Sequence, residues 1–321
     1  MGIAEICRQL AASLNKAVER NPARGLLLSG GLDSSILAIF APEVKALTTG
    51  LKGAHAPDVD YGMKVAAALG LEHHRSFFSA EEAIAALPKV IKMLKTFDLA
   101  LPNDIAIYFA LKLAQERGIT SVMTGDGADE LFAGYSYMYQ LGNKQLHSYI
   151  HRLARTMRFS SANLGQELGL EIKQPYLDRE LIALALEIDP RWKVVNERGK
   201  TWGKWILRKA FETRLPQQII WREKTAIEYG SGTCELRQLI SAQVCNFEVK
   251  KREYGISFLN KEHLFYYEIY REVVGEVPLA KEGEERCPCC GAAAAEPGYC
   301  PICGASGPFC PTSIDSKRAN A

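Results

Sequence analysis

The chain has 321 residues, of which 47% are hydrophobic and 24% are charged. This composition is typical of a folded protein of about two domains, and it excludes a disulfide-stapled peptide and a wholly disordered chain. The formal net charge is only +2. Composition alone therefore gives no reason to expect a nucleic-acid or membrane-surface partner.

The first twenty residues have the pattern of an amphipathic helix and not that of a signal peptide. Their apolar residues recur at helical spacing, at Ile3, Ile6, Leu10, Leu14 and Val18. No apolar run approaches the roughly 18 to 20 residues that a membrane span needs. Six of the nine cysteines lie between positions 287 and 310, which favours metal binding over a disulfide framework. We therefore expect a cytoplasmic protein with no membrane partner.

Short apolar runs alternate with helical stretches from about residue 20 to residue 141. Asn21-Pro22 ends the first helix, Pro57 and Gly70 bracket a later one, and Ser79 with Glu82 forms a capping box. The expected strands cover residues 25–28, 44–49, 72–78 and 120–124, and the expected helices cover residues 34–40, 57–69, 79–95 and 103–117. This alternation predicts an α/β fold with a parallel sheet that carries helices on both faces.

Strand signals fade between about residues 141 and 274, where helical periodicity dominates. We expect residues 1–275 to form one unit, with an α/β core at 20–141 and a helical part at 142–275. Residues 276–286 contain Gly, Pro and charged side chains without apolar periodicity, which is typical of a linker. Residues 287–321 then form a small cysteine module and a tail.

The first chemically informative segment, residues 29–35, reads Ser-Gly-Gly-Leu-Asp-Ser-Ser after an expected strand. Glycines between a strand and a helix present several backbone N–H groups to one point, which favours phosphate. The Gly-Lys-Ser/Thr ending of the Walker loop is missing. Asp33 would repel phosphate unless a divalent cation lay between them, so the segment predicts a magnesium nucleotide. The alternative is a glycine-rich turn in which Asp33 or Ser34 caps the helix.

A second loop, residues 124–135, follows the last expected strand and reads Thr-Gly-Asp-Gly-Ala-Asp-Glu-Leu-Phe-Ala-Gly-Tyr. Both loops leave the carboxyl ends of parallel strands, the edge where ligands bind in open α/β sheets. We therefore expect Asp33 and Asp129 to share one cation. The alternative is that Asp126, Asp129 or Glu130 only caps the following helix.

These two loops resemble the pyrophosphate-loop and Gly-Glu/Asp-Gly-x-Asp-Glu signatures of the synthetase domain of asparagine synthetases, which belongs to the N-type ATP pyrophosphatases. Residues 169–178, Gly-Leu-Glu-Ile-Lys-Gln-Pro-Tyr-Leu-Asp, resemble the family's Gly-Leu-Glu-x-Arg-x-Pro-Phe-Leu-Asp stretch. Arg222-Glu223-Lys224 resembles its Arg-x-Lys segment. The resemblance spans about residues 20–240, with the motifs in order.

The resemblance implies a fold like that of the adenine nucleotide alpha-hydrolases and the activity of an ATP-dependent carbon–nitrogen ligase. Such an enzyme adenylates a carboxylate, releases pyrophosphate and lets ammonia or an amine displace AMP. It further implies that Asp33 and Asp129 bind Mg²⁺, that Asp126 borders the substrate as a catalytic residue, and that Lys224 stabilises the charged transition state. The residues expected to bind the nucleotide and its substrate are Ser29, Gly30, Gly31, Asp33, Ser34, Ser35, Thr48, Thr49 and Gly125.

The sequence departs from the glutamine-dependent members of this family in two places. Their glutaminase nucleophile is the cysteine after the initiator Met, whereas this position is Gly2. We therefore expect the chain to use free ammonia, another amine or the product of a nitrogen-donating partner protein. Lys95 stands where those enzymes usually carry Glu, and residues 101–104 replace a small-hydroxyl run. A reversed charge beside the substrate pocket would alter which acid fits, so the sequence does not assign aspartate as the acid. Asn103 has the alternative role of a helix cap.

The last motif is a pair of Cys-Pro-x-Cys-Gly knuckles at residues 287–291 and 300–304. Each knuckle turns two thiolates onto one point, so Cys287, Cys290, Cys300 and Cys303 are expected to hold one structural Zn²⁺ in a small zinc ribbon. We expect this module to lie apart from the ATP site. The chemical alternative for the whole chain is a pyrophosphate-loop enzyme that thiolates or amidates a tRNA base, but residues 281–321 form no basic patch and RNA binding is not favoured.

Overall fold

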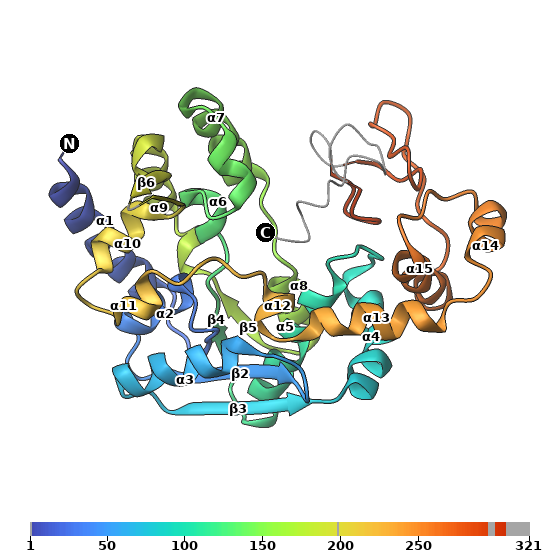
Figure 1. Ribbon diagram of the computed structural model, residues 1–321, viewed down its shortest axis with the longest axis horizontal. Helices are drawn as coiled ribbons and strands as arrows, with labels where there is room; N and C mark the ends of the chain where they lie inside the picture. Colours follow the sequence, from blue (N-terminus) through green and yellow to red (C-terminus); the bar gives the residue numbers. More distant parts are fainter. Residues whose placement is uncertain (1, 198, 295–298, 306–321) are drawn as a thin grey trace.

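The computed structural model describes residues 2–197, 199–294 and 299–305. Its centre is a five-stranded, wholly parallel sheet with the strand order β3-β2-β1-β4-β5 (Figure 1). The strands are β1 (Gly25–Leu27), β2 (Lys45–Leu51), β3 (His73–Phe78), β4 (Ser121–Met123) and β5 (Glu171–Lys173). The strand order reverses between β1 and β4, so the two loops that follow these strands lie side by side at the carboxyl edge.

The sheet is covered by helices on both faces, as predicted. Neighbouring residues of β2 point to opposite faces: Ala46 joins one apolar core and Leu47 joins the other. The early helices are α1 (Ile3–Arg20), α2 (Leu32–Phe40), α3 (Pro57–Leu69), α4 (Ala80–Leu94) and α5 (Leu101–Glu116). The capping box of α4 is confirmed, because Ser79 N–H donates to Glu82 Oε2 at 2.7 Å and Glu82 N–H donates to Ser79 Oγ at 3.2 Å.

The part expected to be helical, residues 142–275, also contains three short strands that the sequence analysis did not identify. β5 pairs with β4 over Glu171–Lys173, and an antiparallel hairpin joins β6 (Val195–Glu197) to β7 (Lys200–Trp202). Each of these strands has only three residues, which is too short to show the alternation that marks a strand in a sequence. In β5 the side chain of Ile172, which stands between Glu171 and Lys173 in the sequence, packs against the core. The pairing of β5 with β4 extends the sheet by one strand.

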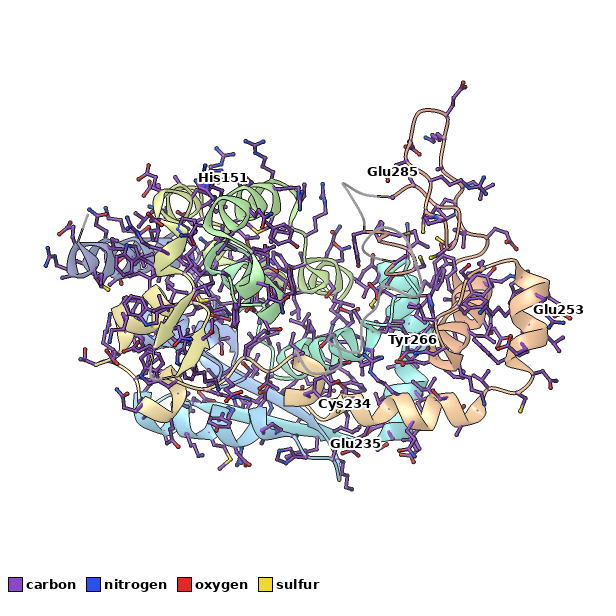
Figure 2. The ribbon with its side chains drawn as sticks, turned by 45° about the horizontal axis from the view of Figure 1, so that its top comes forward. His151, Cys234, Glu235, Glu253, Tyr266 and Glu285 are labelled. Atoms are coloured by element: carbon purple, nitrogen blue, oxygen red, sulfur yellow. The ribbon has the colours of Figure 1, made fainter. Side chains whose placement is uncertain are left out.

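The remaining helices form two flanks around the sheet. One flank packs α9 and α10 against α1, and the other packs α13 and α15 against α4. Figure 2 shows His151 on α7 and Glu253 on α14 towards opposite sides of the molecule. The remaining helices are α6 (Ala128–Phe132), α7 (Asn143–Thr156), α8 (Ser160–Glu167), α9 (Arg179–Glu187), α10 (Trp205–Phe211), α11 (Gln217–Ile220), α12 (Ile227–Gly230), α13 (Leu236–Gln243), α14 (Phe247–Tyr254) and α15 (Lys261–Val273).

Within the described residues, none of the helices has the length and apolar character required to traverse a bilayer.

The cysteine segment follows α15 and folds back onto the body of the molecule. Isolated antiparallel bridges join Leu279 to Ala292 and Arg286 to Ala293. All four knuckle cysteines predicted to bind metal are buried in the same apolar core as α4, α5 and α15. Cys310 and the tail beyond residue 305 lie outside the described residues.

Candidate active site

The loop between β1 and α2 makes a tight turn at the carboxyl end of β1 that depends on glycine. Gly30 has φ +65°, and a Cβ there would lie 2.2 Å from the backbone carbon of Tyr61, so only glycine fits. α2 begins at Leu32, and its N-cap is Gly31, which makes no side-chain cap. Asp33 and Ser34 therefore do not cap this helix. Ser35 Oγ donates to Gly31 O at 2.7 Å, which holds the loop in place.

The second loop brings its carboxylates to the same edge without using Asp129 as a cap. The N-cap of α6 is Gly127, again without a side-chain cap. A Cβ on Gly125 would lie 3.1 Å from Asp33 Cβ, so the two loops touch. Glu130 accepts a hydrogen bond from Tyr135 Oη at 2.6 Å, and burial raises the pKa of Glu130 to about 7. The alternative that these acids serve only as caps is wrong for α6.

A lysine that the sequence analysis missed lies between the two predicted metal ligands. Lys204 Nζ is 2.5 Å from Asp33 Oδ2 and 2.6 Å from Asp129 Oδ1, and the residue is only 3% exposed. Burial would raise the pKa of Asp129, but the ammonium groups of Lys204 and Lys224 outweigh it and lower the pKa. Burial raises the pKa of Asp33 despite Lys204. Two carboxyl groups and one ammonium group thus meet at the carboxyl ends of β1 and β4, with Lys204 bridging Asp33 and Asp129.

Lys224, the predicted catalytic lysine, reaches the same cluster from the segment before α12. Its Nζ lies 3.4 Å from Asp129 Oδ2. The neighbouring Arg222 fixes this segment, because it donates to Ser29 O at 2.9 Å and to Asp58 Oδ1 at 2.6 Å. Arg222 therefore ties Lys224 to the phosphate loop. The motif Arg-x-Lys marked this segment in the sequence, but nothing in the sequence indicated that Asp58 would be its partner.

The predicted adenine and substrate residues are also at this edge. Thr48 and Thr49 are buried, and their hydroxyls are used within the protein: Thr48 Oγ1 donates to Leu28 O at 2.5 Å and Thr49 Oγ1 to Ala106 O at 3.3 Å. Asp126 accepts hydrogen bonds from Thr124 Oγ1 at 2.6 Å, Ser161 Oγ at 2.5 Å and Gln174 Nε2 at 3.0 Å. These three neutral donors orient the Asp126 carboxylate.

Most of these groups line one cavity of about 990 Å³. This is the upper end of the roughly 300 to 1,000 Å³ usual for small-molecule sites, so the cavity has room for more than a nucleotide phosphate. The lining includes most of the predicted nucleotide, magnesium and catalytic residues; these are Ser29, Gly31, Asp33, Ser34, Thr48, Thr49, Gly125, Asp126, Asp129 and Lys224. Gly30 and Ser35 do not line it and shape the loop from behind.

The same cavity is also lined by polar residues of α5 and α8 and by the turn before α5. Asp98, Asn103 and Asp104 line it, and burial raises the pKa of Asp104 to about 7. Asn103 does not cap α5, because its Oδ1 accepts a hydrogen bond from Glu228 N–H at 2.8 Å. Lys95 is exposed and does not line the cavity, so its charge does not act inside the pocket.

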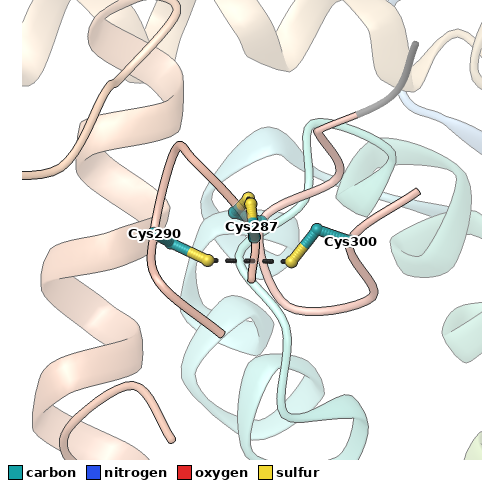
Figure 3. A group of neighbouring side chains, drawn as sticks. Cys287, Cys290 and Cys300 are labelled. Carbon is teal, nitrogen blue, oxygen red and sulfur yellow. Dashed lines mark hydrogen bonds between the residues drawn. The ribbon is translucent and has the colours of Figure 1, made fainter. Parts of the chain in front are cut away.

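The cysteine knuckles fit a tetrahedral metal. The Sγ atoms of Cys287 and Cys303 are 3.7 Å apart, those of Cys290 and Cys300 are 3.6 Å apart, and all four lie within 4.8 Å of one another (Figure 3). Zn–S bonds of about 2.3 Å at tetrahedral angles require S–S distances of about 3.8 Å. The donor set and its spacing therefore suit Zn²⁺. The expectation that the module lies apart from the ATP site is wrong, because Tyr299 and Pro301 line the cavity.

A parallel α/β sheet with a glycine-rich loop and an acidic loop at its switch point has the architecture of nucleotide-binding α/β proteins. The chain belongs to the asparagine synthase family, whose model matches residues 5–168 and 143–286. The family match thus identifies which kind of nucleotide-binding α/β protein the chain is.

The chain is similar to two curated asparagine synthetases and, more weakly, to one solved structure. A probable glutamine-hydrolysing asparagine synthetase of Schizosaccharomyces pombe is 30% identical over 308 residues, covering 82% of this chain and 54% of that protein. Asparagine synthetase B of Escherichia coli is 28% identical, covering 87% and 55%. The chain thus spans about half the length of the curated relatives it matches. Among solved structures, NMN synthetase from Francisella tularensis aligns with a TM-score of 0.38 at 17% identity, covering 88% of this chain and 99% of that one.

Proposed function

We propose that the protein is an ATP-dependent carbon–nitrogen ligase that adenylates a carboxylate and passes the acyl group to ammonia or an amine, releasing AMP and pyrophosphate. Family membership supports ATP-dependent ligase chemistry. The observation that carries the proposal is the meeting of the phosphate loop, Asp129 and Lys224 in one cavity that is also lined by polar residues of α5 and α8. In this proposal the cavity holds both the nucleotide and the acid that it activates.

In this proposal the backbone N–H groups of the phosphate loop and the side chains of Ser29 and Ser34 hold the pyrophosphate part of ATP. Asp33 and Asp129 would hold Mg²⁺, since carboxylate oxygens are the ligands it prefers, and Asp33 Oδ1 is buried without a hydrogen-bond partner. The ion would neutralise negative charge on the phosphates. Lys204 compensates the two carboxylates from the protein side.

Lys224 is placed to act on the transition state. It belongs to a segment fixed by Arg222 and lies beside the acidic loop, and in this proposal its charge would act near the α-phosphate of ATP. Negative charge that develops there as the carboxylate attacks would be stabilised by a preorganised ammonium group. Asp126, fixed by three hydrogen bonds, borders the same region and positions the substrate.

We further propose that residues 1–275 form the catalytic unit, that residues 276–286 link it to the knuckles, and that the four cysteines hold a structural Zn²⁺. The four thiolates leave no open coordination position at a tetrahedral ion, so the metal would supply folding energy and no chemistry. We propose the cytoplasm as the compartment, because it keeps thiols reduced and the described cysteines form no disulfide.

The test is a pyrophosphate-release assay with ATP, Mg²⁺ and a panel of carboxylates, run in parallel with ammonium, with glutamine and with bulk tRNA. The proposal expects release of pyrophosphate and AMP that depends on one acid and on ammonium or an amine. Activity that requires tRNA and no free acid would overturn it in favour of base modification. A response to glutamine alone would indicate a nitrogen-donating activity that the proposal does not include.

A further inference from the structure

The cysteine segment is docked onto the turn that precedes α5. Thr96 Oγ1 donates to Ile302 O at 3.0 Å, and Phe97 N–H donates to the same carbonyl at 2.8 Å. The Phe97 ring is fully buried and packs edge-on against Tyr267 and Tyr270 of α15. The second knuckle therefore has a defined position relative to the body, and it is not a freely tethered module.

This docking carries Tyr299 into the cavity wall. Its hydroxyl donates to Asp98 Oδ2 at 2.7 Å, and Tyr299 and Pro301 line the same cavity as the phosphate loop. Gly304 approaches the Asp98 carboxylate from the other side: a Cβ there would lie 2.1 Å from Asp98 Oδ1, and φ is +71°. The second knuckle thus holds Asp98 between a tyrosine hydroxyl and a glycine that cannot be replaced.

Asp98 in turn belongs to a connected path that ends at the catalytic segment. Its Oδ1 accepts a hydrogen bond from Ala100 N–H at 3.0 Å, one residue before α5 begins. Asn103, in the first turn of α5, continues this path. Its Oδ1 accepts a hydrogen bond at 2.8 Å from the N–H of Glu228, which lies in the first turn of α12. α12 follows directly after the segment that carries Lys224. Asp98, Ala100 and Asn103 of this path line the cavity, whereas Glu228 does not.

We propose that the cysteine segment forms the wall of the cavity opposite the phosphate loop and that Tyr299, with Asp98, binds and positions the non-nucleotide substrate. This inference rests on the proposed function, because it names the residues that bind the acid in that same site. Metal at the knuckles would hold the wall in place, so metal loading governs the affinity for the acid and leaves the affinity for ATP unchanged.

Tyr299→Phe and Tyr299→Ala test this inference, with Tyr254→Phe as the matched control. Tyr254 also donates its hydroxyl to a carboxylate, Glu268 Oε1 at 3.1 Å, but it lies outside the cavity. The assay is pyrophosphate release with the best acid of the wild-type panel, and it yields separate KM values for the acid and for ATP. Zinc content is measured for every variant.

We expect the KM for the acid to rise about tenfold or more in Tyr299→Ala and to rise less in Tyr299→Phe. A rise of this size is typical of the loss of a hydrogen bond to a charged group. The KM for ATP and the zinc content should stay at their wild-type values, and Tyr254→Phe should match the wild type throughout. Unchanged KM values in both Tyr299 variants, or equal rises for acid and ATP, would overturn the inference. If Tyr299→Ala loses zinc, its KM values no longer report on the side chain alone, and the KM values of Tyr299→Phe decide the test. A wild type that releases no pyrophosphate with any acid would instead overturn the proposed function, and this inference with it.

Discussion

Replacement of Lys204 by Met tests the electrostatic centre of the site. The substitution keeps an unbranched side chain of similar length but removes the ammonium group that lies 2.5 Å from Asp33 and 2.6 Å from Asp129. The two carboxylates would remain largely buried, with side chains 19% and 14% exposed. Lys224, at 3.4 Å from Asp129, would be the nearest remaining compensating charge among the described ion pairs.

Removal of one partner from a buried ionic cluster usually costs about 3–5 kcal/mol, because the remaining charge stays desolvated. We expect a loss of that size in the free energy of unfolding at about pH 8 without divalent cations. The loss should shrink on acidification, because the native carboxylates would then have raised pKa values and take up protons that the unfolded chain does not bind. Mg²⁺ should restore part of the stability, since it binds the native cluster and not the unfolded chain.

The assay is urea unfolding of the wild type and Lys204→Met, with and without Mg²⁺. Lys209→Met is the control. Lys209 lies in the last turn of α10 and pairs with Glu212, and both side chains are about a quarter exposed. Such partly exposed pairs contribute about 1 kcal/mol or less to stability. A loss for Lys204→Met no larger than that of the control, or no response to Mg²⁺, would refute the electrostatic reasoning.

Three further outcomes are expected. Lys224→Ala should bind ATP nearly normally but lose about a hundredfold in kcat, the effect of removing a preorganised charge; a change confined to KM would assign Lys224 to binding. Burial raises the pKa of Asp104 to about 7, so the native carboxyl retains a proton that the unfolded chain releases, and stability falls as pH rises from about 4 to 7. Asp104→Asn should flatten this dependence in urea unfolding at about pH 5 and about pH 8, and an undiminished slope would contradict the assignment. Metal analysis should find one zinc per chain, lost in Cys300→Ser and kept in Cys245→Ser, where the exposed thiol lies outside the cluster; equal zinc in both variants would exclude the knuckle site.

The parts of the fold that local chemistry determines could be predicted from the sequence. α3 spans Pro57–Leu69 as predicted, because Pro suits the first helical turn and Gly70 ends the helix with φ +69°. The adjacency of the phosphate loop and the acidic loop was also predictable, since both follow parallel strands whose carboxyl ends share one edge.

The parts that depend on distant contacts could not be predicted. Lys204 is separated from Asp33 by 171 residues, and it follows a three-residue strand that has no sequence signature. The cysteine segment showed its metal chemistry clearly in its spacing, but its docking depends on the carbonyl of Ile302 meeting the turn at Thr96. The motifs therefore indicated which chemistry each segment carries, whereas only the structure showed that Tyr299 lines the same cavity as the phosphate loop.

The most direct test of the account is acid-dependent exchange of labelled pyrophosphate into ATP by the full-length chain, measured without ammonium. A ligase that forms an acyl-adenylate should incorporate label only when its acid and Mg²⁺ are present, and Asp129→Asn should abolish the exchange while the protein stays folded, because one carboxylate ligand of the cation is lost. Exchange that needs no acid, or turnover of ATP to ADP and phosphate in its place, would contradict adenylation of a carboxylate at this site.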